Sequence, residues 1–190
     1  MFRWKGGFYF MKKYFTFSVY DMCEIGLLVA AAIVLDLPFL KFKLFSNGGS
    51  ISLTMLPLFI LAIRQGPFKG FLAAGVIYGC IDCLIDGNPA SSIPLDYLLG
   101  YGSVFVLGFT NDICRKGLTT KKYIVCGLLC LLATFIRLCF GTLSGIVQWE
   151  TPFVESLIYN MTYILPTGGL ATIGTLLLLK PNEQVGRKLA

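Results

Sequence analysis

Residues 123–136 read "YIVCGLLCLLATFI" and contain no charged side chain, and residues 100–111 are equally free of charge. A soluble domain needs charged surface in every segment, whereas a helix that crosses a bilayer needs about 20 mainly apolar residues. Across all 190 residues, 56% are hydrophobic and only 14% are charged. Both observations predict an all-α membrane protein with room for one domain.

Six apolar segments approach or exceed the length of a membrane-spanning helix, and they cover residues 22–40, 51–64, 68–87, 93–111, 121–145 and 153–180. We therefore expect a bundle of six transmembrane helices in residues 21–181. A basic, aromatic lead-in (1–20) precedes the bundle and a short cytoplasmic tail (182–190) follows it. The second segment is the shortest and starts with "SISLTML", so we expect a partly non-helical start or close pairing with the third segment.

Lysine and arginine predict the orientation of this bundle, because cytoplasmic loops carry an excess of both. With both termini inside the cell, 13 of the 16 basic residues lie on the cytoplasmic side. They are Arg3, Lys5, Lys12, Lys13, Arg64, Lys69, Arg115, Lys116, Lys121, Lys122, Lys180, Arg187 and Lys188. The net charge of +6 thus reflects topology and contact with anionic membrane lipid, and it requires no nucleic-acid partner.

Seven cysteines raise the question of a metal or redox site. Cys80 and Cys83 form a "CIDC" pair, but the sequence holds no second pair at ligand spacing and no histidine. No serine or cysteine stands beside a base at a recognisable motif spacing. We predict no metal, no cofactor and no catalytic residue, with the cysteines packed as small apolar side chains.

Polar side chains nevertheless gather at the start of the last segment, "WETPFVESLIYNMTYILPTGG" (149–169). On a helix with 100° per residue, Glu155, Tyr159, Asn160 and Tyr163 lie on one face. Lipid cannot satisfy such a stripe, so it must face protein, water or a ligand. Pro166 and the two glycines that follow it predict a bend below this stripe.

Three other segments bring polar groups to the same outer depth, namely Tyr78, Asp82 and Asp86; Asp96, Tyr97, Tyr101 and Ser103; and Thr134, Arg137, Gly141 and Ser144. These groups form either interhelical contacts or an outward-facing ligand pocket, and we favour the pocket because intramembrane ionisable residues are by default functional candidates. Arg137 fits both roles equally.

The chemistry of this pocket suits a planar cation. We expect carboxylates to outnumber basic groups there, and the rings of tyrosine and Trp149 offer faces that attract a cation. An amide such as that of Asn160 would orient ring nitrogens. An intramembrane enzyme that uses carboxylate pairs remains a minority alternative, as does a purely structural protein.

Residues 48–79, "GGSISLTMLPLFILAIRQGPFKGFLAAGVIYG", resemble the thiamin-specific substrate-binding S component of energy-coupling factor (ECF) vitamin transporters. Further matches are "LDY" at 95–97, Arg137, Ser144, Gly145 and Trp149 in the fifth segment, and "SLIYNMTYILP" at 156–166. The matches extend from about residue 24 to residue 166. The resemblance implies a multi-pass protein of the bacterial plasma membrane that captures thiamin outside the cell.

The resemblance also implies roles for single residues. Asp96 and Tyr97 match an acidic–tyrosine pair, Trp149 matches a stacking aromatic residue, and Asn160 matches the residue that contacts the aminopyrimidine. Tyr78 stands where tryptophan is often found.

Glu155, Tyr159 and Tyr163 complete the predicted substrate-binding set. Two positions depart from the family pattern, because Gly141 replaces an expected histidine and Glu155 an expected tyrosine. These changes should enlarge and acidify the site, so a thiazole, an aminopyrimidine or another cationic precursor remains an alternative ligand.

An S component does not hydrolyse ATP, and the resemblance implies three partners: a transmembrane coupling protein and two ATPase subunits. Gly26 and Ala30 in "GLLVA" place small residues one turn apart on the first segment, which suits either packing within the chain or docking of the coupling protein, and the family context favours docking. In the loop "KFKLFSNGGS" (41–50) we predict a lid, with Gly48 and Gly49 as its hinge and Phe45 closing over the ligand.

Overall fold

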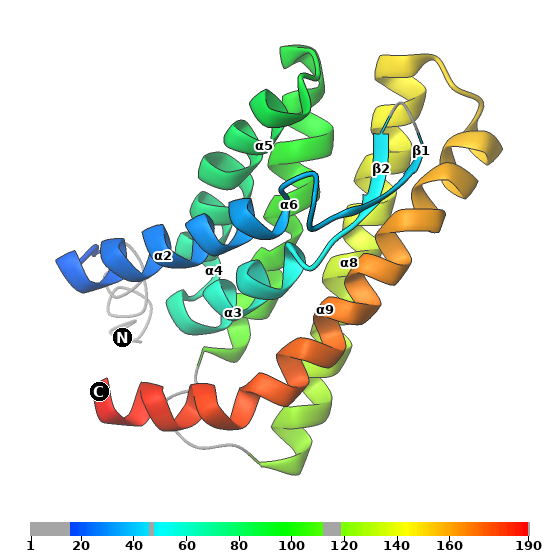
Figure 1. The fold of residues 1–190 in the computed structure, drawn as a ribbon. Helices are drawn as coiled ribbons and strands as arrows, with labels where there is room; N and C mark the ends of the chain where they lie inside the picture. The colour runs from blue at the N-terminus through cyan, green and yellow to red at the C-terminus, as the bar shows by residue number, and fades with distance from the viewer. Residues whose placement is uncertain (1–15, 46–47, 112–118, 190) are drawn as a thin grey trace, which may run out of the picture.

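The computed structural model of the chain describes residues 16–45, 48–111 and 119–189 (Figure 1). Residues 1–15 of the predicted lead-in, Ser46 and Asn47 of the predicted lid, and the basic loop 112–118 lie outside the described residues. The helical elements are α2 (Val19–Leu35), α3 (Met55–Gln65), α4 (Pro67–Phe71), η1 (Leu72–Tyr78), α5 (Gly79–Asp86), η2 (Ala90–Ser92), η3 (Ile93–Leu99), α6 (Gly100–Gly102), η4 (Ser103–Thr110), α8 (Thr120–Trp149) and α9 (Phe153–Leu189).

Each of the six predicted apolar segments contains helix, so the all-α membrane fold is confirmed. Within the described residues, four helical stretches are long and apolar enough to cross a membrane: Pro67–Asp86, Ala90–Thr110, Thr120–Trp149 and Phe153–Pro181. The other two segments form shorter helices, α2 with 17 residues and α3 with 11. Helix α9 extends to Leu189, so the backbone of the predicted tail continues the last helix.

Two of the spans depart from regular α-helix over part of their length. The third predicted segment passes through the π-helical turn η1, and the fourth combines the π-helical η3 with the 3₁₀-helical η4. Such departures from the α-helical ladder re-aim the side chains that follow, and they often lie at functional sites. Here η3 carries Asp96 and Tyr97.

The predicted lid loop is an antiparallel β-hairpin of β1 (Phe42–Phe45) and β2 (Gly48–Ile51). The register pairs Phe42 with Ile51, Lys43 with Ser50 and Phe45 with Gly48. The non-helical start expected for the second segment is thus strand β2, and α3 begins only at Met55. The sequence did not predict this pairing: an Asn-Gly pair is present at 47–48, but each flanking strand is only four residues long and lacks a strong alternating pattern.

The start of α2 is defined by a capping box. Ser18 Oγ accepts a hydrogen bond from the backbone N–H of Asp21 at 3.1 Å, and Asp21 Oδ2 accepts one from the N–H of Ser18 at 3.0 Å. Asp21 also accepts a hydrogen bond from Lys69 at 2.7 Å, which ties α2 to α4. Burial raises the pKa of Asp21, but Lys69 and Ser18 outweigh burial, so this pKa lies below its usual value.

The α3–α4 corner needs glycine for two reasons. Gly66 ends α3 with a φ of 90°, a left-handed conformation that other residues rarely adopt, and Pro67 then starts α4. Across from this corner, a Cβ on Gly108 would lie only 2.1 Å from the backbone nitrogen of Pro67. The backbone of η4 therefore packs directly on the backbone of the α3–α4 corner.

The ends of the helices separate into two groups. Figure 1 shows the start of α8 and the end of α9 at one end of the molecule, and the β-hairpin, the end of α5 and the α8–α9 connection at the other. The positions in Figure 1 agree with the predicted topology.

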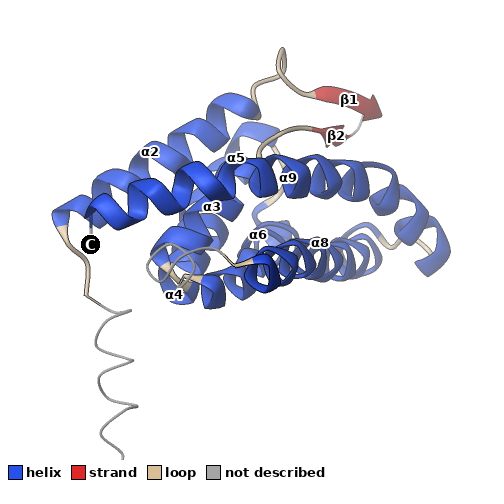
Figure 2. Ribbon diagram, turned by 90° about the horizontal axis from the view of Figure 1, so that it is seen from below, coloured by secondary structure: helices blue, strands red, loops and turns tan. Residues whose placement is uncertain are grey.

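Figure 1 also shows α9 changing direction in its second half; this helix contains Pro166, which cannot donate to the helical ladder. Figure 2 gives the view from below, in which α8 and α9 lie on the same side as the hairpin.

Candidate functional site

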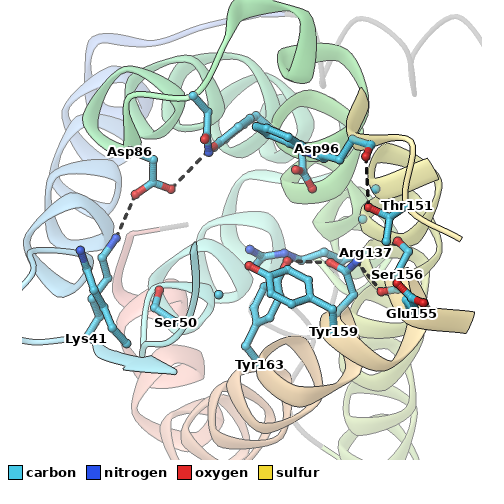
Figure 3. Close-up of a pocket in the computed structure, with 18 residues that line it drawn as sticks. Lys41, Ser50, Asp86, Asp96, Arg137, Thr151, Glu155, Ser156, Tyr159 and Tyr163 are labelled. Atoms are coloured by element: carbon cyan, nitrogen blue, oxygen red, sulfur yellow. Dashed lines mark hydrogen bonds and ion pairs between the residues drawn. The ribbon is translucent and has the colours of Figure 1, made fainter. Parts of the chain in front are cut away.

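A cavity of about 750 Å³ lies at the end of the molecule that carries the hairpin (Figure 3). It is lined by the hairpin, the end of α5, η3, the second half of α8 and the first half of α9. The lining residues are Lys41, Lys43, Gly49, Ser50, Asp86, Asn88, Asp96, Tyr97, Arg137, Gly141, Gly145, Trp149, Thr151, Glu155, Ser156, Tyr159, Asn160 and Tyr163. In Figure 3, Asp96 lies on one wall and Tyr159 and Tyr163 on the opposite one.

Seven of the eight residues predicted to bind substrate line this one cavity: Asp96, Tyr97, Trp149, Glu155, Tyr159, Asn160 and Tyr163. They come from three helices: η3 is far in the sequence from the end of α8 and the start of α9, so their convergence is a property of the fold. Trp149 ends α8 and is 55% exposed, which leaves its ring accessible for stacking.

Tyr78 lies outside the cavity lining. It is fully buried in the core, and its ring packs edge-to-face against that of Tyr101 at a centroid distance of 4.7 Å. Its hydroxyl finds no hydrogen-bond partner in the part of the chain that the structure describes. Direct contact between Tyr78 and a ligand therefore remains a prediction without support from the geometry.

The amide of Asn160 is held by its own helix. Its Oδ1 accepts a hydrogen bond from the Tyr163 hydroxyl at 2.6 Å, and its Nδ2 donates to the backbone carbonyl of Ser156 at 2.8 Å. Nδ2 also donates a long hydrogen bond to Ser156 Oγ at 3.5 Å. An amide oxygen has two lone pairs, so one acceptor position remains for a ligand, and the weakly bonded N–H can be redirected to it. The rings of Tyr159 and Tyr163 meet edge-to-face at 5.5 Å on the same wall.

Helices α8 and α9 approach closely beside this amide, and glycine on α8 makes the approach possible. A Cβ on Gly141 would lie 2.8 Å from Asn160 Oδ1, and one on Gly145 would lie 2.1 Å from Ser156 Oγ. Ser156 donates a hydrogen bond to the carbonyl of Thr142 at 2.9 Å across the same contact. The departure at Gly141 thus has a structural reason, because Asn160 occupies the space that a side chain would need.

A hydrogen-bonded chain connects the hairpin to η3. Lys41 Nζ donates to Asp36 Oδ2 at 2.8 Å and to Asp86 Oδ1 at 3.1 Å. Tyr97 donates to Asp86 Oδ2 at 3.3 Å and accepts from Asn88 Nδ2 at 2.5 Å. Burial lowers the pKa of Lys41, but the carboxylates of Asp36 and Asp86 outweigh it, so the pKa lies above its usual value and Lys41 stays protonated.

The charge of the cavity corrects one expectation. Three acidic residues line it (Asp86, Asp96 and Glu155), but three basic ones do so as well (Lys41, Lys43 and Arg137). The predicted excess of carboxylates over basic groups is therefore wrong for the lining. The reason is the hairpin, which folds its two lysines toward the helices, whereas a count along the helices leaves these lysines in an outer loop.

Arg137 is the residue whose role the sequence left undecided, and it lines the cavity. Its guanidinium carbon lies 4.0 Å from the centroid of the Tyr101 ring, a cation–π contact. A charged residue in the middle of an apolar helix is the signal that pointed to it. Lys41, Lys43 and Asn88 lacked any such signal, because loop residues acquire their neighbours only in the folded chain.

The predicted docking residues lie on α2, and the predicted lid residues lie in the β-hairpin that follows it. Gly26 and Ala30 are exposed on α2, and a Cβ on Gly26 would meet no atom within 4 Å, so packing within the described chain does not account for the glycine. Phe45 and Gly48 close the hairpin ladder, and Gly49, with a φ of 63°, lines the cavity. The lid role stays a prediction, which slower proteolysis of the hairpin turn in the presence of ligand would support.

Comparisons with known proteins agree with one another. The family model of the thiamine transporter protein matches residues 22–186. The thiamine transporter ThiT of Bacillus subtilis is 30% identical over 161 residues, which cover 77% of this chain and 83% of that protein. A solved structure of ThiT from Listeria monocytogenes matches with a TM-score of 0.74, over 89% of this chain and 98% of that one. Its sequence identity is 21%, so this last likeness shows the fold alone.

Proposed function

The chain belongs to the thiamine transporter protein family, and on this premise we propose that it is the substrate-capture subunit of an ECF-type importer. It is a multi-pass protein of the bacterial plasma membrane. In this proposal it binds thiamin from outside the cell and delivers it with a separate ATPase module. Membership in a transporter family decides against the carboxylate enzyme that the sequence left open.

The observation that carries the proposal is the convergence of seven predicted ligand residues on one cavity. Its volume of about 750 Å³ falls within the range of small-molecule sites, roughly 300–1,000 Å³. The cavity lies at the end opposite the basic loops, which is the outer side in the predicted topology. A ligand that enters there meets a carboxylate, aromatic rings and an amide at once.

Each part of thiamin has a partner in this arrangement. Asp96 and Glu155 face the thiazolium cation. The half-buried carboxylate of Asp96 attracts a cation more strongly than a carboxylate in water, whereas Glu155 is exposed and contributes less. Trp149 stacks against a ring, and Asn160 reads the edge of the aminopyrimidine through the free acceptor position of Oδ1 and the weakly bonded N–H of Nδ2. Arg137 interacts electrostatically with Asp96 and balances its charge.

Thiamin is expected to quench the fluorescence of the purified protein in a saturable way, because an electron-poor ring stacked on Trp149 accepts an electron from the excited indole. The chain has two tryptophans, Trp4 and Trp149. Trp149→Phe should therefore abolish the quench and weaken binding, by calorimetry, about tenfold or more. Trp4→Phe is the matched control and should leave both unchanged. Unaltered emission together with no heat on addition of thiamin would contradict the proposal.

A thiamin-like precursor is the second candidate, and Glu155 favours it because it adds a carboxylate at the cavity wall. Gly141 does not enlarge the site as the sequence predicted, because Asn160 occupies the space of the missing side chain. The same titration with the separate aminopyrimidine and thiazole halves distinguishes the two ligands. Tighter binding of one half than of whole thiamin would assign the site to that precursor.

The proposed partners are one coupling protein and two ATPase subunits, and the exposed Gly26–Ala30 face of α2 is the proposed docking surface. Gly26→Leu places a bulky side chain on this open face. It should retain thiamin binding but lose co-purification with the ATPase subunits. Val34→Leu, on an exposed position of the same helix, is the control and should retain both. Retained co-purification in Gly26→Leu would remove this face from the interface.

A further inference from the structure

Three carboxylates, one at the end of α2 and two on α5, lie close together. Asp36 follows α2, Asp82 lies inside α5, and Asp86 ends α5. One carboxylate oxygen from each lies within 4.8 Å of the other two. Asp36 and Asp82 are buried, while Asp86 is 36% exposed and lines the cavity, which connects the cluster to the outside.

Hydrogen bonding leaves part of this cluster unsatisfied. Asp82 Oδ2 accepts a hydrogen bond from the Tyr101 hydroxyl at 2.7 Å, but Asp82 Oδ1 has no partner among the described residues, although Asp82 is only 1% exposed. The buried hydroxyl of Tyr78 also lacks a partner, and it interacts electrostatically with Asp82 and Asp36. Two orphaned oxygens at one buried position require an explanation, and an ion is one of the few that fit.

Lys41 accounts for only part of the negative charge. Its ammonium contacts Asp36 and Asp86, but no contact with Asp82 is found within the described residues. Thr54 Oγ1 donates to Asp36 Oδ1 at 3.3 Å without adding charge. Arg137 interacts electrostatically with Asp82 but forms no ion pair with it among the described residues. In the described part of the chain a single ammonium therefore contacts this cluster of three carboxylates, and burying two of them is costly unless further positive charge arrives.

We propose that Asp36, Asp82 and Asp86 form an outward-facing binding site for a divalent cation of the calcium type, for which the Lys41 ammonium competes. Calcium binds oxygen ligands at about 2.3–2.6 Å, so oxygens on opposite sides of one ion lie about 5 Å apart, close to the spread of this cluster. The Tyr78 hydroxyl supplies a further oxygen beside Asp82. Because Lys41 directly precedes β1, cation binding and the position of the hairpin are coupled.

Terbium, which replaces calcium at oxygen sites, tests the proposal in purified, detergent-solubilised protein without thiamin. Tyr78 and Tyr101 lie beside the cluster, so their excitation should sensitise terbium emission there, and calcium should displace the signal. Asp82→Asn and Asp86→Asn should each lower the terbium affinity about tenfold or more, because each removes a ligand charge. Lys41→Met should raise the affinity several-fold, because it removes the competing cation.

The aspartate variants are expected to lower the terbium affinity and Lys41→Met to raise it, so a general loss of structure cannot produce both results. Asp21→Asn, at the other end of α2, is the matched control and should leave the affinity unchanged. Absence of saturable sensitised emission would overturn the proposal, and so would equal affinity in the wild type and Asp86→Asn. Weaker terbium binding in Lys41→Met would overturn it as well. Asp86 lies at an exposed helix end, so its variant tests the site even if Asp82→Asn fails to fold.

Discussion

Asp96→Asn is expected to weaken thiamin binding by about 100-fold or more, the largest single-residue effect in the cavity. Removing one partner of a desolvated charge pair costs roughly 2–5 kcal/mol, because the other charge is left without compensation. The lining carries three acidic and three basic residues. The substitution gives it an excess positive charge, which repels a cationic ligand. Calorimetry on the purified protein measures the change directly.

Two controls separate charge from folding in this experiment. Asp21→Asn makes the same chemical change outside the cavity and should keep wild-type affinity. Glu155→Gln changes an exposed lining residue and should cost about threefold at most, because solvent screens exposed charges. If Asp96→Asn instead lowers the unfolding temperature while thiamin affinity persists, Asp96 is only the internal partner of Arg137.

Gly141→Ala is expected to reduce both thiamin affinity and stability. The new Cβ would lie 2.8 Å from Asn160 Oδ1 and 3.3 Å from Ile164 Cδ1, so Asn160 has to move. Movement breaks its hydrogen bond with Tyr163 or with the carbonyl of Ser156. We expect a loss of about tenfold in affinity and roughly 1–3 kcal/mol in stability, as is typical of overpacked sites. Thermal unfolding and calorimetry on the same sample measure both quantities.

Gly141→His sharpens this test, because family resemblance alone would predict that histidine improves binding. The geometry predicts the opposite, since histidine shares the Cβ that collides with Asn160. Gly169→Ala is the matched control: its Cβ would meet no atom within 4 Å, so it should change stability by about 0.5 kcal/mol or less, or increase it. Wild-type affinity in Gly141→Ala would show that Asn160 moves without cost and does not read the ligand.

The sequence was informative about single helices. The charge-free window 123–136 lies within α8, and the polar stripe of residues 155–163 lines the cavity on α9. Both predictions rest on the helical period, which depends only on nearby residues and does not change with the arrangement of neighbouring helices. Tyr78 shows the limit of this reasoning, because it has the helical spacing of a cavity residue and yet lies in the core.

The residues alone determined the class of the protein, its predicted orientation and the faces that its helices turn away from lipid. They did so because a bilayer admits few backbone structures and penalises every unpaired polar group. Only the tertiary structure decided the charge of the cavity, the fit of Asn160 against Gly141, and the meeting of Asp36 with Asp82 and Asp86. These contacts join segments that are distant in the sequence, through the folded hairpin and the close approach of α8 and α9. Neither feature can be predicted from the periodicity of a single segment.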